Sequence, residues 1–173
     1  ITFLVICVYY PAIFADYNSV DDLKMVNSLL NRDRIDLFSL FRPPTTFYYR
    51  PLLILTYYAD LKLWGALPSF MHLGNVLIHL VNTLLVFWLG WMLYGKDDEK
   101  KKLLPLFAAL LFGLHPVNTE SVNWISGRTD PMGTLFVLAS LLVLLYGLER
   151  KRAWYGCWAA LIFLAGVMSK EVM

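Results

Sequence analysis

A polar stretch between two apolar runs holds the side chains of this sequence that are best suited to chemistry. Residues 115–130 read HPVNTESVNWISGRTD and bring together His115, Glu120, Arg128 and Asp130. Ionisable side chains beside membrane segments are costly unless they are paired or functional. The stretch therefore favours an active site at a membrane surface. The alternative is a solvated loop with incidental charges.

Composition indicates which class of protein must position these residues. Of the 173 residues, 58% are hydrophobic and 16% are charged, and the mean hydropathy is +0.56. Because soluble domains carry about 25% charged residues, the sequence predicts an integral membrane protein. The net charge of +2 is too small to indicate nucleic-acid binding. Cys7 and Cys157 both lie in apolar segments, so neither a disulfide framework nor a metal site is predicted.

Five apolar segments are expected to be helices that cross the membrane. They cover about residues 1–14, 69–94, 103–117, 131–148 and 153–168. The first is shorter than the roughly 20 residues that a spanning helix needs, and it does not begin with Met. We therefore expect the chain to be the N-terminal fragment of a larger membrane domain. A cleaved signal peptide is the alternative, but the segment has neither a basic start nor a small-residue cleavage site.

Two basic clusters predict the orientation of these helices. The lysines at 100–102 and the basic residues at 150–152 should share the cytoplasmic side. Hydropathy alone would also permit a re-entrant segment at 103–117, but the charge pattern requires that it cross. The segments then expected on the non-cytoplasmic side are 15–68, 115–130 and 169–173.

The long first loop is expected to carry two amphipathic helices. Ser19 and Asp22 have the spacing of a capping box, and an apolar pattern follows at Val20, Leu23, Val26 and Leu30. Pro51 suits the first position of a second helix, LLILTYYADLKLW, which Gly65 closes. Both helices could lie among lipid headgroups or pack on the bundle. The predicted fold class is all-α, a polytopic transmembrane bundle with this loop outside the cytoplasm.

A polar stripe runs along the longest span. His72, Asn75, His79 and Asn82 recur at steps of three, four and three, so they share one helical face. The two histidines are two turns apart, roughly 10 Å, which is too far for one metal ion. Interhelical hydrogen bonding is the favoured interpretation.

Five segments, taken in order, carry a family resemblance. They are FADYNSVDD, YYRPL, PSFMHLGNVLIHLVN, HPVNTESVNWISGRTDPM and MSKE. In this order they resemble the membrane half of the tetratricopeptide-bearing O-mannosyltransferases and their bacterial relatives, within the C-type glycosyltransferase superfamily. The resemblance covers essentially the whole chain, and its most specific part is the HP-x-x-T-E-S-V stretch with the arginine that follows it.

The resemblance implies an activity and its partners. The donor would be a lipid-linked sugar, a polyprenyl or dolichyl phosphate mannose, and the acceptor a hydroxyl on a protein or other molecule outside the cytoplasm. The implied location is a bacterial inner membrane or the endoplasmic reticulum membrane. Further spans and a repeat domain would follow. Neither the sequence nor the resemblance decides whether a metal is needed.

The resemblance also implies which acid is catalytic. Family members often carry paired acids just after the first span, where this chain has Ala15 and Asp16. Asp16 is therefore the expected general base. Asp21 and Asp22 are the alternatives, although a place in a helix cap already accounts for both.

Sugar transfer from a lipid phosphate also needs cations for the leaving phosphate. Arg50, Arg128 and Lys170 fall on the predicted outer side, at ends of apolar segments. The alternatives are snorkelling for Lys170 and salt bridges with Asp130 or Glu120 for Arg128. The expected pocket residues are His115, Glu120, Asp130 and Glu171.

A second class of function stays open, a non-catalytic transporter or scaffold whose buried charges only pair with each other. The two classes differ in the position of the charges. In an enzyme, Asp16 should converge with Arg50, Arg128 and Lys170 on one outward pocket, whereas the charges of a scaffold would be scattered.

Overall fold

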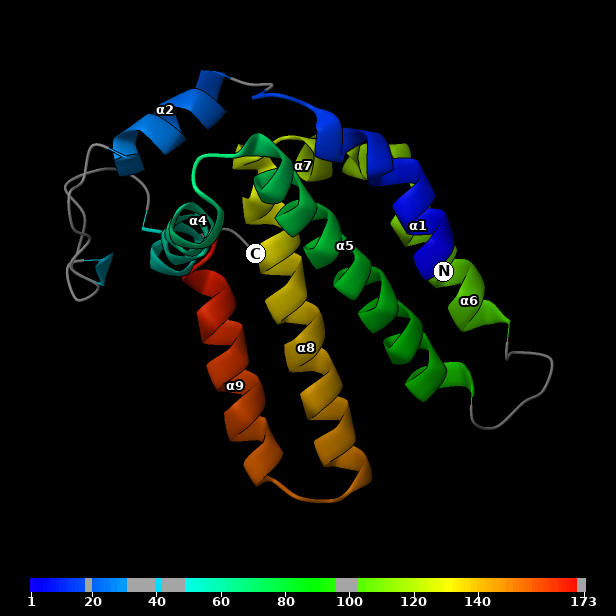
Figure 1. Cartoon of the computed structure of the whole chain (residues 1–173). Coiled ribbons are helices and arrows are strands. Elements are labelled where there is room, and N and C mark those ends of the chain that lie inside the picture. The colour runs from blue at the N-terminus through cyan, green and yellow to red at the C-terminus, as the bar shows by residue number, and fades with distance from the viewer. Residues whose placement is uncertain (18–19, 31–39, 42–48, 96–102, 171–173) are drawn as a thin grey trace.

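The structure is a computed structural model, and the part that it describes is all helical (Figure 1). The described residues are 1–17, 20–30, 40–41, 49–95 and 103–170. Within them, helices and turns account for the regular structure and no strand occurs. The all-α prediction is therefore confirmed for these residues.

The predicted apolar segments coincide with helices. In chain order they are α1 (Thr2–Tyr9) continued by the 3-10 helix η1 (Tyr10–Phe14), α5 (Pro68–Gly90) continued by the short π-helix η2 (Trp91–Gly95), α6 (Leu104–Leu114), α8 (Thr129–Glu149) and α9 (Trp154–Val167). Two helical stretches, Pro68–Tyr94 and Ser126–Glu149, are long and apolar enough to cross a membrane. The other three are shorter, and their crossing remains a prediction.

Two further helices lie at one end of the bundle (Figure 1). These are α2 (Val20–Leu30) and α4 (Pro51–Trp64). Pro51 stands at the first turn of α4, and Gly65 ends the helix in a conformation with φ of 71° that only glycine adopts easily. Both predicted boundaries of this helix are confirmed. Ser19, the expected cap of α2, lies outside the described residues.

The two helices of the first loop pack on the bundle with one face. Val26 and Leu29 of α2 share a buried cluster with Leu53 of α4 and Met71 of α5. The predicted apolar face of α2 is partly wrong, because Leu23 and Leu30 are exposed. The buried face of α2 turns instead toward the residues that connect α7 and α8, as its fully buried Asp22 shows.

The polar stripe on α5 faces the protein interior, as predicted. His72, Asn75, His79 and Asn82 are all buried. Each hydrogen-bonds a backbone carbonyl of another segment: Asp16 at 3.2 Å, Trp124 at 2.6 Å, Gly113 at 3.0 Å and Pro131 at 2.8 Å, in the same order. The stripe therefore connects α5 to its neighbours through backbone carbonyls. Those of Gly113 and Trp124 lie at the C-terminal ends of α6 and α7, where carbonyls lack partners within the helix.

The helix α8 separates the two ends of the bundle (Figure 1). At its start lie α7 (Thr119–Asn123) and the 3-10 turns η4 (Pro116–Asn118) and η5 (Ser126–Arg128). At its end lies the turn to α9, with the basic residues at 150–152. Its 21 residues span about 30 Å, the thickness of a hydrocarbon core. The polar stretch 115–130 and the basic turn are thus one membrane thickness apart.

Candidate functional site

A cavity of about 950 Å³ lies among α2, α4, α7, η5 and the start of α8. Four of the predicted site residues line it: Asp21, Arg50, Glu120 and Asp130. The rest of its wall is partly apolar, with Met25, Leu29, Leu53 and Ile54 among the lining residues. Acids, the two cations Lys24 and Arg50 and an apolar wall therefore meet at one end of the bundle, contributed by three distant parts of the sequence.

The adjacent acids of α2 have opposite environments. Asp21 lines the cavity and forms an exposed ion pair with Lys24, at 3.6 Å. Asp22 is fully buried, and its carboxylate accepts a hydrogen bond of 2.7 Å from the backbone N–H of Ser126. Adjacent residues of a helix point about 100° apart, so one acid is available to a ligand and the other anchors the turn η5.

Asp16 lies outside this cavity. It is exposed, and its carboxylate accepts a hydrogen bond from the N–H of Tyr17 at 2.8 Å. Asp16 is not among the residues that line the cavity, so its expected convergence with the cations stays a prediction. The chain becomes extended at Ala15, with φ and ψ of −73° and 151°, and the carbonyl of Asp16 lies 3.2 Å from Nε2 of His72 on α5.

Arg128 is almost completely enclosed, with 1% of its surface exposed. Its Nε donates to Oδ1 of Asn75 at 2.7 Å, and its Nη2 donates to the carbonyl of Met71 at 2.8 Å. Its Nη1 forms an ion pair with Asp60 at 2.6 Å and reaches Thr56 at 3.4 Å. These contacts hold α4 and α5 together through the guanidinium. The expected contact of Arg128 with a phosphate stays a prediction.

The partner of Arg128 also differs from the expected alternative. Asp60 of α4 pairs with it, in place of Asp130 or Glu120. The ring of Tyr57 lies against the guanidinium, with 4.6 Å between the guanidinium carbon and the ring centroid. Arg128 therefore joins α4 to α5 from the turn just before α8.

Three side chains from three helices fix the backbone of residues 124–126. Asn75 of α5 donates to the carbonyl of Trp124 at 2.6 Å, and Tyr57 of α4 donates to that of Ile125 at 2.7 Å. Asp22 of α2 accepts from Ser126. Burial raises the pKa of the Tyr57 phenol, and the opposing effect of Arg128 is smaller, so Tyr57 stays a neutral donor. This wall of the cavity is rigidly held.

Lys170 reaches the site through Asp130. Its ammonium forms an ion pair with one carboxylate oxygen of Asp130, and Ser121 donates to the other at 3.3 Å. The side chains of Lys170 and Asp130 are 35% and 45% exposed, so this pair stays open to a ligand. The end of α9 is held near α4, because the N–H of Leu52 donates to the carbonyl of Met168 at 3.4 Å.

The remaining predicted pocket residues have different outcomes. Glu120 is exposed and lines the cavity. His115 is exposed as well, but it does not line the cavity, and its Nδ1 accepts a hydrogen bond from the N–H of Val117, which caps η4. Glu171 lies outside the described residues. Within the described ranges, no group of three His, Cys, Asp or Glu side chains could hold a metal ion.

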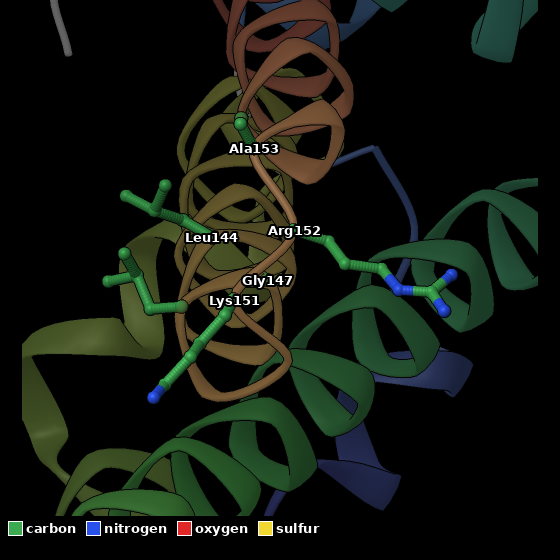
Figure 2. A pocket seen from close by; sticks show the side chains of 7 residues that line it. Leu144, Gly147, Lys151, Arg152 and Ala153 are labelled. Carbon is green, nitrogen blue, oxygen red and sulfur yellow. The ribbon is translucent and has the colours of Figure 1, made fainter.

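A second cavity of about 410 Å³ lies at the other end of α8, beside the turn to α9 (Figure 2). Its lining contains two cations, Lys151 and Arg152, and no acid. Figure 2 shows their side chains extending to opposite sides of the hairpin. This cavity has no group that could accept a proton, so it is the weaker candidate for an active site.

Sequence reasoning missed several residues that hold the site. Thr56, Tyr57 and Asp60 contact Arg128, and Trp124 lines the cavity. The steps of one, three and four among 56, 57 and 60 place these side chains near one face of a helix. That spacing was the available signal for a polar face on α4. For Trp124 the sequence offered no such signal.

Comparisons with known proteins bear on this site. The chain is 37% identical to the protein O-mannosyl-transferase TMTC1 of Homo sapiens over 94 residues, which are 54% of this chain and 10% of that protein. It is 32% identical to the protein O-mannosyl-transferase F38B6.6 of Caenorhabditis elegans over 123 residues, 71% of this chain and 17% of that protein. It is 38% identical to TMTC4 of Homo sapiens over 104 residues, with shares of 54% and 14%.

The chain thus spans between a tenth and a sixth of the length of these relatives. No family model matches it. No solved structure matches it either. The similarity therefore rests on sequence alone, and several related proteins show it at 32–38% identity.

Proposed function

Because this chain belongs to the family of the TMTC protein O-mannosyl-transferases, we propose that it forms part of a membrane glycosyltransferase. The protein moves mannose from a polyprenyl phosphate donor to a hydroxyl of a protein acceptor. The reaction takes place at the end of the bundle that carries the 950 Å³ cavity, on the non-cytoplasmic side of the membrane. The basic turn at the other end of α8 faces the cytoplasm, in keeping with the charge distribution of membrane proteins.

One observation carries this proposal. The cavity combines acids, cations and an apolar wall, which are the three requirements of the reaction. The acceptor oxygen forms a bond to C1 of the sugar, and the bond from C1 to the phosphate oxygen breaks. The lipid phosphate leaves with the electron pair, and the hydroxyl proton passes to a carboxylate. The apolar residues of α2 and α4 suit the lipid part of the donor.

Asp21 is the proposed general base. Of the three acids considered for this role, it alone lines the cavity. Its ion pair with Lys24 is exposed and therefore weak, so it does not prevent contact with an acceptor. Asp22 serves the fold through Ser126. Asp16 accepts a hydrogen bond from the N–H of Tyr17 and does not line the cavity.

Arg50 and Lys170 are the proposed phosphate ligands. Arg50 lines the cavity directly, and Lys170 adjoins it through Asp130. Cations at these places stabilise the charge that develops on the departing phosphate. Arg128 contributes by fixing the cavity wall. The rival function, a scaffold whose charges only pair with each other, is less well supported, because Asp21 and Glu120 face open space.

The test compares the three acids of the first loop. Membranes that contain the whole protein are supplied with labelled polyprenyl phosphate mannose and an acceptor peptide rich in serine and threonine. Removal of a general base lowers rates by about 10²- to 10⁴-fold, so Asp21→Asn should lose transfer while protein level stays normal. Asp16→Asn should transfer at nearly the wild-type rate, and Asp22→Asn should mainly lower stability.

Two outcomes would contradict this assignment. If Asp21→Asn transfers normally while Asp16→Asn is inactive, the general base is Asp16 and the assignment of Asp21 is wrong. If wild-type membranes transfer no mannose under any condition that keeps the protein folded, the proposed activity itself is wrong.

A further inference from the structure

The cavity wall carries one large ring that the transfer chemistry leaves unused. Two aromatic residues line the cavity, Tyr57 and Trp124. Tyr57 is 2% exposed beneath Arg128, whereas Trp124 is 40% exposed. Of these two rings, Trp124 is therefore the one that a ligand in the cavity can reach.

Trp124 sits on an immobilised backbone. Its N–H donates to the carbonyl of Glu120 at 3.0 Å, and its own carbonyl accepts from Asn75 at 2.6 Å. The next residue, Ile125, is fully buried and is held by Tyr57. A ring whose backbone is already fixed loses less freedom when a ligand binds, so it can orient that ligand at lower entropic cost.

The groups that surround Trp124 select the chemistry of its ligand. Glu120, Asp130 and Asp21 line the same cavity. The cations Lys24 and Arg50 belong to the α2 and α4 side of the cavity, and Lys24 pairs with Asp21. Glu120 and Asp130 lie on the same stretch of chain as Trp124, where they disfavour an anion close to the ring but readily accept hydrogen bonds from hydroxyls. A pyranose ring has an apolar C–H face, which packs on an aromatic surface, and a rim of hydroxyls.

We propose that Trp124 is the platform on which the sugar ring of the donor rests, with the neighbouring carboxylates holding its hydroxyls. This inference rests on the proposed function, since it assigns a place to the sugar within the same cavity. The platform orients C1 of the sugar, with its phosphate toward Arg50 and Lys170. It makes Trp124 a determinant of sugar recognition, separate from the residues that bind the phosphate.

The role of Trp124 differs from that of the other exposed tryptophans. Trp88 of α5 and Trp158 of α9 are 59% and 54% exposed, and neither lines the cavity. Tryptophans on the outer faces of apolar helices suit contact with lipid headgroups. Trp158 is therefore a matched control for Trp124, with a similar residue and exposure but no proposed sugar contact.

Fluorine NMR can read the environment of Trp124 directly. The sequence of 173 residues contains six tryptophans. Labelling the whole protein with 5-fluorotryptophan gives each tryptophan a resonance, and the one that disappears in Trp124→Phe belongs to Trp124. The probes are a short-chain polyprenyl phosphate mannose and the same polyprenyl phosphate without sugar. We expect a saturable shift of the Trp124 resonance with the first probe and none with the second. Equal shifts with both probes, or no shift with either, would contradict the proposal that the sugar ring packs on Trp124.

Kinetics of transfer supply the second measurement. Trp124→Leu keeps an apolar side chain but removes the ring, and it should raise the KM for the donor by about tenfold or more, with kcat changed less. Trp124→Tyr should retain most of the donor affinity, and Trp158→Leu should leave KM unchanged. A normal KM in Trp124→Leu would overturn the platform without touching the proposed function. Loss of all transfer from the wild type, with the sugar-dependent shift intact, would overturn the function and leave the platform standing.

Discussion

The two ends of α8 carry similar charges in opposite environments. At the start of the helix, Arg128 is 1% exposed and bonded to side chains of α4 and α5. At its end, Arg150, Lys151 and Arg152 are all exposed. Each end also has a cavity, but only the larger one is lined by acids as well as a cation. The difference separates a cation enclosed by partners within the fold from cations that are open to the surroundings of the protein.

This comparison shows that the charge of a residue says less about its role than the partners that enclose it. A cation can hold an anionic ligand only if its donors are available. Arg128 therefore belongs to the fold of the active end, although it lies in the most specific motif of the family resemblance. Lys170, with a partly exposed ion pair, keeps the capacity to change partners.

The largest expected effect is on thermal stability, and it compares one arginine from each end of α8. Arg128→Ala leaves Asp60 and the acceptors of Asn75 and Met71 without their donor. Breaking a buried ion pair from one side costs about 3–5 kcal/mol, so the variant should unfold at a much lower temperature in detergent. Arg152→Ala, an exposed change, should fall within about 0.5 kcal/mol of the wild type. Comparable losses in both variants would show that the two ends are not different.

The next effect concerns how closely α8 packs on α9. A Cβ at Gly147 would lie 2.4 Å from the Cβ of Tyr155, whereas one at Gly156 would have no neighbour within 4 Å. Overpacking typically costs about 1–3 kcal/mol, so Gly147→Ala should lower thermal stability and Gly156→Ala should not. Donor KM should be unaffected in both. A change in KM for Gly147→Ala would mean that the hairpin and the site at the other end are coupled.

A smaller effect compares the lysines of the two ends. Lys170→Met removes a cation beside the cavity, and Lys151→Met removes one from the turn. A partly exposed charge-assisted contact is worth about a factor of ten in affinity, so Lys170→Met should raise the donor KM by about tenfold. Lys151→Met should leave it unchanged, and Lys170→Arg should restore most of it. If both methionine variants have the same donor KM, Lys170 does not bind the donor and serves only as the ion-pair partner of Asp130.

Local patterns in the sequence predicted most of the fold. Apolar runs bounded by proline and glycine gave the helices and several of their ends, such as Pro51 and Gly65 of α4. The spacing of the polar stripe on α5 gave its buried face. The predicted buried face of α2 was partly wrong, because a long-range contact determines which side of this helix is buried. Asp22 reaches Ser126, 104 residues away, and this contact has no trace in the pattern around Asp22.

The site was predictable in its composition but not in its geometry. Asp21, Arg50, Glu120 and Asp130 do share a cavity. Asp16, which the family resemblance favoured as the general base, does not line that cavity. The sequence also could not give Asp60 as the partner of Arg128, since 68 residues separate them. Which polar groups become buried depends on packing between helices, and a single sequence does not specify that packing.

The smallest predicted effect tests whether Tyr57 holds the cavity wall as a neutral donor. Its hydroxyl donates to the carbonyl of Ile125 at 2.7 Å, and a net hydrogen bond is worth about 1 kcal/mol. Tyr57→Phe should therefore lower stability at neutral pH by about that amount, while Tyr94→Phe, an exposed change, should not.

The pH dependence of Tyr57→Phe makes this test sharper. Burial raises the pKa of Tyr57 above its ordinary value of 10, so the folded protein holds the phenolic proton more tightly than the unfolded chain. That stabilisation is complete below pH 10 and is lost as the pH rises above it. Thermal unfolding in detergent should show wild type and Tyr57→Phe approaching each other above pH 10. A constant gap at every pH would mean that Tyr57 ionises as easily in the fold as outside it, and that this wall of the cavity is open to water.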